Sequence, residues 1–179
     1  LDARSWLQRK GYLVGLNIMQ VADRSEAEIE DVANRASERP PDVLYFADSM
    51  GGLDADGISR IVSVVRRGWS GSLGVHTHDN MGRALTNTLR AIAEGVSWVD
   101  ATVTGMGRGP GNARTENLAI EVSEIRATPI DISPLLALIS KYFRKMQDKY
   151  GWGTNPYYYL AGKYGIHPTY IQVMLSDSR

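Results

Sequence analysis

Two histidines, His76 and His78, stand two residues apart at the end of the apolar segment Leu73–His78. Residues two apart on a β-strand point to the same side, so a strand here would bring both imidazoles together. Two imidazoles at one spot provide half of a divalent-metal site, and neutral imidazoles suit Zn, Mn, Fe or Co. The chain has three histidines, and two of them lie at this spot. The alternative interpretation is that both are simply polar residues at a strand end.

The composition limits the classes of protein to which the chain can belong. Its 179 residues suffice for one domain with a hydrophobic core. Twenty basic and twenty acidic residues cancel, which argues against a nucleic-acid or membrane-surface partner recognised by bulk charge. The absence of cysteine excludes disulfides and thiolate metal sites and favours a cytoplasmic protein. We find no signal peptide and no apolar run near the ~20 residues of a membrane span.

Four apolar, β-rich segments alternate with helical patterns along the first part of the chain. Such alternation predicts an α/β fold with a parallel sheet, and right-handed crossovers place the helices outside it. Ser25, three residues before Glu28, marks the start of the first of these helices as a capping box. On pattern alone, a doubly wound sheet and a (β/α) barrel both remain possible. The predicted strands are Tyr12–Met19, Val43–Ala47, Leu73–His78 and Trp98–Thr104.

The pattern changes near Ser133, where Ser133 and Pro134 form an N-cap followed by proline at the first helical position. A long amphipathic helix is predicted from there to Met146, followed by a glycine- and tyrosine-rich stretch and shorter helices. We therefore divide the chain into a βα region, residues 1–128, and a helical C-terminal region, residues 129–179.

Polar or glycine-rich residues follow each predicted strand, and ligands of parallel α/β folds bind at the carboxyl ends of the strands. Asp48 and Ser49 follow the second strand, where they either shape a pocket or form an Asx turn. Asp79 and Asn80 follow the two histidines. This context, with a glycine-rich loop one strand later, favours the metal-site interpretation of the histidine pair.

The glycine-rich loop Gly105–Asn112 lacks both the dinucleotide-binding fingerprint and the lysine of a P-loop. Its glycines are interpreted as turn residues that allow the backbone to approach the site closely. Asn112 either caps the following helix or offers an amide oxygen near the metal. Arg108 either holds an anionic group of the substrate or is a solvated loop residue.

Three further features receive mainly structural interpretations. Asp100 lies within a predicted strand and is assigned a structural role. His167 precedes a proline and is interpreted as a helix-entry residue. The tyrosines 157–159 are interpreted as packing residues, one of which could reach the substrate.

The runs Leu73–Gly82 and Val99–Asn112 together resemble the metal-dependent aldolase/lyase/synthase superfamily. Its members include HMG-CoA lyase, 4-hydroxy-2-oxovalerate aldolase, and the isopropylmalate and homocitrate synthases. The resemblance covers Leu1 to about Arg126 and implies a (β/α)8 TIM barrel. Only the last four βα units of such a barrel are present here, followed by a C-terminal helical appendage.

The same resemblance implies roles for the histidines and for the loop asparagine. His76 and His78 correspond to metal ligands, and Asn112 corresponds to an asparagine that lies near or on the metal in several members. The metal is expected to be Mn or Mg, with Zn or Co as alternatives. The superfamily's first strand supplies an arginine and a metal-binding aspartate, and this sequence contains no such strand.

A half-barrel would leave two open parallel edges and an uncovered core. We therefore expect the chain to be part of a longer protein and to be inactive alone. A split-gene subunit and a self-complementing dimer of half-barrels are the alternatives.

Within the superfamily, the segment Ala47–Ser49 and the glycine-rich loop look most like the 4-hydroxy-2-oxovalerate aldolases. In that group the helical region carries a tyrosine that contacts the substrate, and the nearest register places Pro156 there, with Tyr157 beside it. The resemblance thus implies cleavage of a 4-hydroxy-2-oxo acid to pyruvate and an aldehyde, or the reverse reaction. The candidate catalytic residues are Asp48, Ser49, Arg108 and Tyr157, and the candidate metal ligands are His76, His78 and Asn112.

Two other functions remain open at this point. One is an acyl-CoA condensing synthase of the isopropylmalate or homocitrate type, and the other is a non-catalytic half-barrel that serves as an assembly partner. For the aldolase we expect a 2-oxo acid substrate, a homo-oligomer and, for the helical region, an aldehyde dehydrogenase as a further partner.

Overall fold

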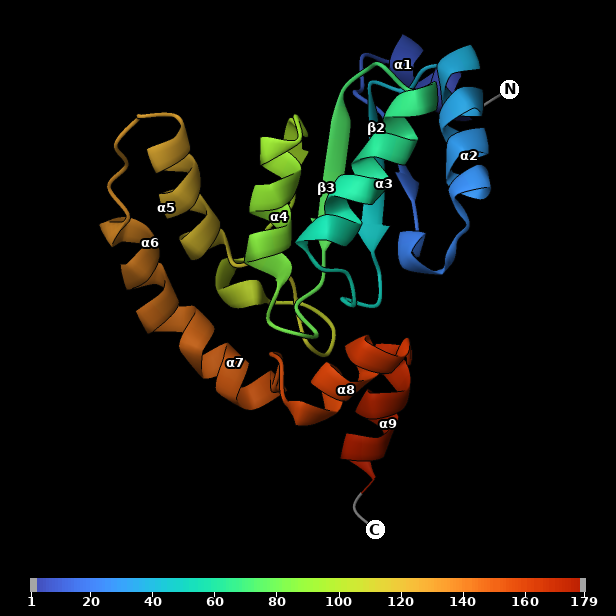
Figure 1. Cartoon of the computed structure of the whole chain (residues 1–179). Coiled ribbons are helices and arrows are strands. Elements are labelled where there is room, and N and C mark those ends of the chain that lie inside the picture. The colour runs from blue at the N-terminus through green and yellow to red at the C-terminus, as the bar shows by residue number, and fades with distance from the viewer. Residues whose placement is uncertain (1–2, 178–179) are drawn as a thin grey trace.

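The computed structural model of the chain describes residues 3–177, in which strands and helices alternate before a run of helices closes the chain (Figure 1). The strands are β1 (Gly15–Ile18), β2 (Val43–Asp48), β3 (Leu73–Thr77) and β4 (Trp98–Val99). The helices of the βα part are α1 (Ala3–Arg9), α2 (Glu26–Glu38), α3 (Ala55–Gly68), α4 (Ala84–Ala93) and α5 (Thr115–Ile125), with 3-10 turns at Val21–Asp23 and Val103–Gly105. The later helices are α6 (Ser133–Leu138), α7 (Arg144–Tyr150), α8 (Pro156–Tyr164) and α9 (Pro168–Ser176), and a π-turn, Ile139–Phe143, joins α6 to α7.

The four strands form one parallel sheet in the order β1-β2-β3-β4. A doubly wound sheet reverses its strand order at a switch point, whereas a barrel adds each strand beside the previous one. The sequential order therefore decides between the two predicted architectures in favour of four successive units of a (β/α) barrel. In the described part of the chain, β1 and β4 each pair along one edge only.

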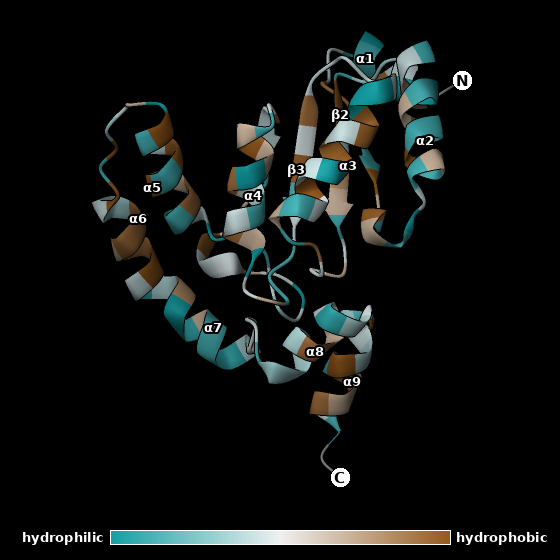
Figure 2. Cartoon of the chain, in the orientation of Figure 1, coloured by the Kyte–Doolittle hydropathy of each residue, from teal (hydrophilic) through white to brown (hydrophobic). Residues whose placement is uncertain are grey.

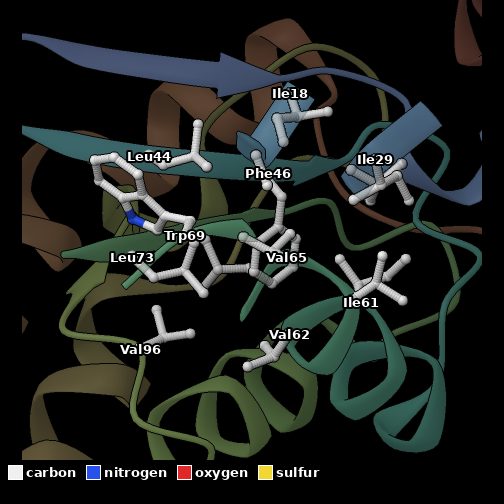
Figure 3. Close-up of a cluster of buried hydrophobic side chains, with 14 of the residues drawn as sticks. Ile18, Ile29, Leu44, Phe46, Ile61, Val62, Val65, Trp69, Leu73 and Val96 are labelled. Atoms are coloured by element: carbon white, nitrogen blue, oxygen red, sulfur yellow. The ribbon is translucent and has the colours of Figure 1, made fainter. Parts of the chain in front are cut away.

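The hydrophobic core lies between the sheet and the helices that cover one of its faces (Figure 3). Alternate residues of the central strands, Leu44 and Phe46 on β2 and Leu73 and Val75 on β3, are fully or almost fully buried in it. Each such side chain contributes about 1.5–3 kcal/mol by leaving water. The helices add the apolar stripes that their spacing predicts, including Ile29, Ile58, Ile61, Val62 and Val65.

The opposite face of the sheet carries the intervening residues, and it is less completely covered. Tyr45 and His76 on this face are partly buried, and the side chain of Trp98 on β4 remains 42% exposed. In a complete barrel this face lines the interior. The histidine pair thus belongs to the interior face, and the helix-packed core belongs to the outer face.

The fourth strand is shorter than predicted, because it leaves the sheet after Val99. Thr102 instead pairs with the returning end of the glycine-rich loop: its amide donates to Ala113, and its carbonyl accepts from Thr115. Thr104 then adopts a left-handed conformation with φ of 56°. The prediction of a strand to Thr104 was wrong because local pairing with the loop replaced pairing with β3.

The first strand is also shorter than predicted, since it spans Gly15–Ile18 rather than Tyr12–Met19. Tyr12 and Leu13 precede it with exposed side chains. Helix α2 begins as expected, with both hydrogen bonds of the Ser25–Glu28 capping box present.

Helices α6 to α9 follow α5, with α6 beside α5, and the run from α7 to α9, shown in orange and red in Figure 1, reaches below the carboxyl ends of the strands. Three hydrogen bonds tie the segment between α7 and α8 to the strand-end loops. The indole nitrogen of Trp152 donates to Thr104 (3.1 Å), and the hydroxyl of Thr154 donates to the carbonyl of Asn80 (2.6 Å). The amide of Gly153 donates to Gly109 (2.9 Å).

Hydropathy varies along these last helices (Figure 2). Helix α7 is mostly hydrophilic, whereas α9 presents the exposed apolar side chains Val173, Met174 and Leu175. None of the helices between residues 3 and 177 combines the length and apolar character that crossing a membrane requires.

We predict that Gly162→Ala weakens the docking of α8 on the strand-end loops. A Cβ atom at this position would lie 2.9 Å from Met81 Cγ, 3.0 Å from Asn80 Cβ and 3.1 Å from the carbonyl oxygen of Gly51. Such overpacking costs about 1–3 kcal/mol. Hydrogen exchange of the α8 amides should therefore accelerate, while Lys163→Ala, at an exposed neighbouring position of the same helix, should leave it unchanged. Equal exchange in both variants would contradict the docking.

Candidate active site

The end of β3 positions the two histidines. Thr77, between them, points to the helix side, where its hydroxyl lies 2.9 Å from the Thr88 hydroxyl and 3.2 Å from the Ala84 carbonyl. His76 and His78 therefore point to the other side, and their ring centroids lie 4.8 Å apart with the ring planes at 83°. The strand spacing predicted this juxtaposition.

Each imidazole makes one hydrogen bond through its Nδ1 atom. Nδ1 of His78 lies 2.9 Å from the carbonyl oxygen of Asp48, and Nδ1 of His76 lies 3.1 Å from Oδ2 of Asp100. A carbonyl and a carboxylate only accept hydrogen bonds, so these contacts assign the proton of each neutral ring to Nδ1. Both Nε2 atoms then keep a free lone pair, and two such nitrogens suit a divalent transition-metal ion.

The surroundings of His78 favour its neutral form. Burial lowers the pKa of His78, and the hydrogen bond to the Asp48 carbonyl opposes this effect only in part. Electrostatic interactions with His76, Arg108 and His167 lower the pKa of His78 further. A neutral imidazole is the form that ligates metals.

The two histidines supply only part of a metal site. Among residues 3–177 there is no group of three or more His, Cys, Asp or Glu side chains arranged to hold an ion. The residues present thus fit half of a mixed nitrogen and oxygen ligand set.

Asp48, at the end of β2, is fully buried. Its carboxylate accepts hydrogen bonds from the amides of Gly52 and Leu53, both at 3.2 Å. These amides lie four and five residues further along the chain, whereas an Asx turn would use the amide two residues on, so Asp48 fixes the loop after β2 without forming the Asx turn predicted as one alternative. Its backbone carbonyl holds His78, as described above. The hydroxyl of Ser49 accepts from the amide of Gln20 at 3.0 Å, so it joins the end of β2 to the end of β1.

Asn112 lies beside His78, and the two residues form an isolated antiparallel bridge. The side-chain nitrogen of Asn112, Nδ2, donates to the carbonyl of Met106 at 3.2 Å within the glycine-rich loop. The helix-capping alternative is wrong, because α5 begins only at Thr115 and its N-cap is Arg114. The loop thus holds the backbone of Asn112 beside His78 rather than at the start of α5.

The tight path of the glycine-rich loop depends on Gly111. This residue has a φ of +82°, and a Cβ atom there would collide with the carbonyl oxygen of Gly105. The Gly111 carbonyl accepts from the amide of Asp79 at 2.9 Å. The loop that follows β4 is therefore fixed directly against the residues that follow β3.

The other two candidate catalytic residues lie toward the surface. Arg108 is exposed and borders a pocket of about 710 Å³ between the glycine-rich loop and α9. Tyr157 is half exposed on α8, and its amide donates to Asn155. The neighbouring Tyr158 is buried instead, with its ring against Gly109.

Asp100 is a contact residue of the site that the sequence analysis assigned only a structural role. The strand register explains its contact with His76. Val75 pairs with Val99, so the residues that follow them, His76 and Asp100, also lie side by side. The hydroxyl of Tyr45 donates to the other Asp100 oxygen at 3.3 Å. Burial and the charge of Asp100 raise the pKa of Tyr45 to about 12, so this hydroxyl remains a donor.

His167 behaves as predicted for a helix-entry residue. It is the N-cap of α9, and its Nδ1 atom accepts from the amide of Thr169 at 3.3 Å.

The sequential parallel sheet, the helices outside it and the polar residues gathered at the carboxyl ends of the strands define an α/β-barrel protein. Residues 3–140 match the model of the HMGL-like family. Because this match spans more than half of the chain, the chain belongs to the HMGL-like family. The family expected from the two histidine and glycine motifs is confirmed.

Individual relatives add detail to this assignment. A 4-hydroxy-2-oxovalerate aldolase of Thermus thermophilus is 40% identical over 97 residues, which cover 53% of this chain and 28% of the relative. A homocitrate synthase of Frankia alni is 30% identical over 145 residues, covering 76% of this chain and 40% of the relative. The chain thus spans less than half the length of these curated relatives.

A solved structure supports the same fold over nearly the whole chain. The N-terminal domain of a candidate aldolase from Bacteroides vulgatus superposes with a TM-score of 0.86 at 30% identity, covering 98% of this chain and 58% of that one. The names of the relatives point to aldolases, lyases or related condensing enzymes.

We predict that Asp48 titrates near pH 6. Its buried position raises its pKa to about 6 from 3.8, although hydrogen bonds from Leu53, Gly52 and Gly51 oppose the shift. Since the folded-state pKa is the higher one, the native state binds the proton more tightly. The associated stability is complete below pH 3.8 and is lost as the pH rises through 6, at a cost on the order of 2–3 kcal/mol.

Carbon NMR of the side-chain carboxyl groups measures this titration directly. Asp42 is an internal control in the same spectra, because a hydrogen bond from the amide of Val14 lowers its pKa. Asp48→Asn should flatten the dependence of unfolding free energy on pH between 4 and 7. An Asp48 inflection below that of an ordinary aspartate would contradict the prediction.

Proposed function

We propose that the complete natural protein is a divalent-metal-dependent aldolase. It would cleave a 4-hydroxy-2-oxo acid to pyruvate and an aldehyde, or catalyse the reverse reaction. The observation that carries this proposal is the pair His76 and His78, with both Nε2 atoms free at the carboxyl end of β3. Its relatives that are named 4-hydroxy-2-oxovalerate aldolase support the choice of substrate class.

In this proposal, His76 and His78 would hold the ion through Nε2. A bound Mn or Mg ion, or alternatively Zn or Co, would act as a Lewis acid that stabilises the enolate charge formed when the carbon–carbon bond breaks. Asn112 would complete the wall of the site, since its backbone already pairs with His78.

The other candidate residues have supporting roles in the proposal. Arg108 is close enough to His78 for its positive charge to lower the pKa of that histidine. It would bind the carboxylate of the 2-oxo acid at the mouth of the site. Asp48 and Ser49 would shape the floor, because they fix the turn after β2 and the end of β1. Tyr157 would contact the substrate only if α8 turned its exposed side toward the site.

We place the remaining metal ligand, an aspartate, and an arginine that balances oxyanion charge outside residues 1–179. Two observations support this placement: no third acidic or histidine ligand joins the pair within residues 3–177, and the described sheet has an open edge at β1. Further βα units would cover the interior face that now exposes Trp98.

A condensing synthase that joins an acyl-CoA to a 2-oxo acid is the second candidate function. The homocitrate synthase of Frankia alni favours it, since that relative matches a larger share of this chain than the aldolase of Thermus thermophilus does. Both reactions pass through an enolate, so the histidine pair serves either one equally.

We predict that the complete protein binds about one Mn²⁺ per chain and that His76→Ala and His78→Ala each abolish this binding. Removing one of two imidazole ligands should lower the kcat/KM of aldol cleavage by at least about 100-fold. Metal content after gel filtration and pyruvate release from a 4-hydroxy-2-oxo acid are the two measurements. His167→Ala, which removes the third histidine of residues 1–179, should retain the metal.

The possible results separate the candidate functions. Unchanged metal content and turnover in His76→Ala would refute the metal site. Turnover with acetyl-CoA and a 2-oxo acid, without aldol cleavage, would assign the synthase reaction. The absence of both activities in a metal-loaded protein would favour a non-catalytic half-barrel.

A further inference from the structure

Three hydrogen-bonded side chains form a line across the interior face of the sheet. The line runs from Tyr45 on β2 to Asp100, one residue beyond β4, and from there to His76 on β3. The Tyr45 hydroxyl donates to Oδ1 of Asp100 at 3.3 Å, and Oδ2 of Asp100 lies 3.1 Å from Nδ1 of His76. Each carboxylate oxygen therefore has its own partner.

The strand register explains how a tyrosine on β2 reaches a residue beyond β4. Tyr45 pairs with Gly74 on β3, and Gly74 pairs with Trp98 on β4. The Tyr45 ring lies across Gly74, because a Cβ atom there would be only 2.5 Å from the ring carbon Cζ. The bare backbone of Gly74 thus lets the ring cross β3 and place its hydroxyl against Asp100.

The two histidines of the pair are held by different kinds of group. His78 donates to a backbone carbonyl, which side-chain substitutions leave in place. His76 depends on a carboxylate whose side chain is 47% exposed. A carboxylate in water has many orientations, so a second hydrogen bond is needed to keep one oxygen facing the ring. The Tyr45 hydroxyl supplies that hydrogen bond.

We propose that Asp100, held in place by Tyr45, is a positioning residue that fixes the Nδ1–H tautomer of His76 and orients its Nε2 lone pair toward a divalent cation. This inference rests on the proposed function. Carboxylates commonly orient metal-ligating histidines in this way, and their loss typically costs 10–100-fold in metal affinity. Without Asp100, the His76 ring would rotate more freely and would populate the Nε2–H tautomer, which cannot ligate through Nε2.

Nitrogen-15 NMR of the imidazole rings tests the inference in the complete, metal-free protein. Wild type should show His76 and His78 both protonated at Nδ1. In Asp100→Ala the His76 signals should move to the Nε2–H pattern, while His78, held by the backbone, should keep its own. A His76 ring that remains protonated at Nδ1 in Asp100→Ala, or that already carries its proton on Nε2 in wild type, would overturn the proposal.

Titration with Mn²⁺ alone gives the second measurement. Asp100→Ala should weaken binding about 10–100-fold. Tyr45→Phe retains the ring over Gly74 and loses only the hydroxyl, so it should weaken binding less and shift the His76 tautomer in part. If Asp100→Ala folds poorly, the tautomer shift and the Mn²⁺ affinity of Tyr45→Phe still test the proposal, and wild-type values for both would contradict it.

Asp56→Asn is the matched control for charge, because Asp56 is a carboxylate on α3 with a 96% exposed side chain. Its Mn²⁺ affinity and its imidazole spectra should equal those of wild type. An equal loss of affinity in Asp56→Asn and Asp100→Ala would reduce the effect to bulk charge and overturn the positioning role. If wild type binds no Mn²⁺, the proposed function fails, while the tautomer measurement still decides whether Asp100 positions His76.

Discussion

The alternation of β3 between two environments is the constraint on which the site depends. Leu73, Val75 and Thr77 face the helices, and the first two are buried in the core. A slip of one residue would expose these side chains and would send both histidines into the helix layer. The hydrophobic free energy of the outer layer therefore determines the direction of His76 and His78, although neither histidine contributes to that core.

The sequence contained enough information for the central strands and the histidine pair, because both depend on local alternation. It was insufficient wherever distant segments compete for the same backbone groups. Thr102 left the sheet to pair with Ala113 and Thr115, which the apolar pattern of residues 98–104 does not indicate. Asn112 was misjudged as a possible cap for the same reason, since its backbone pairs with His78 across the loop.

The contacts that hold the candidate site in place are made largely by backbone groups. The Asp48 carbonyl holds His78, the Gly111 carbonyl accepts from Asp79, and the Asn80 carbonyl accepts from Thr154 of the later helices. Such contacts have no side-chain signature, so sequence patterns reveal the ligands but not their supports. They also link the later helices to the end of β3, although these segments lie more than seventy residues apart along the chain.

Gly74 and Tyr45 share one volume on the interior face, with the missing side chain of one filled by the ring of the other. The residue type at each of these two positions therefore limits the residue type at the other. A related protein can place a larger residue on β3 only if β2 gives up its aromatic ring at the same time. Comparison of relatives should then reveal covariation between positions 45 and 74, with the identity at position 100 following the pair.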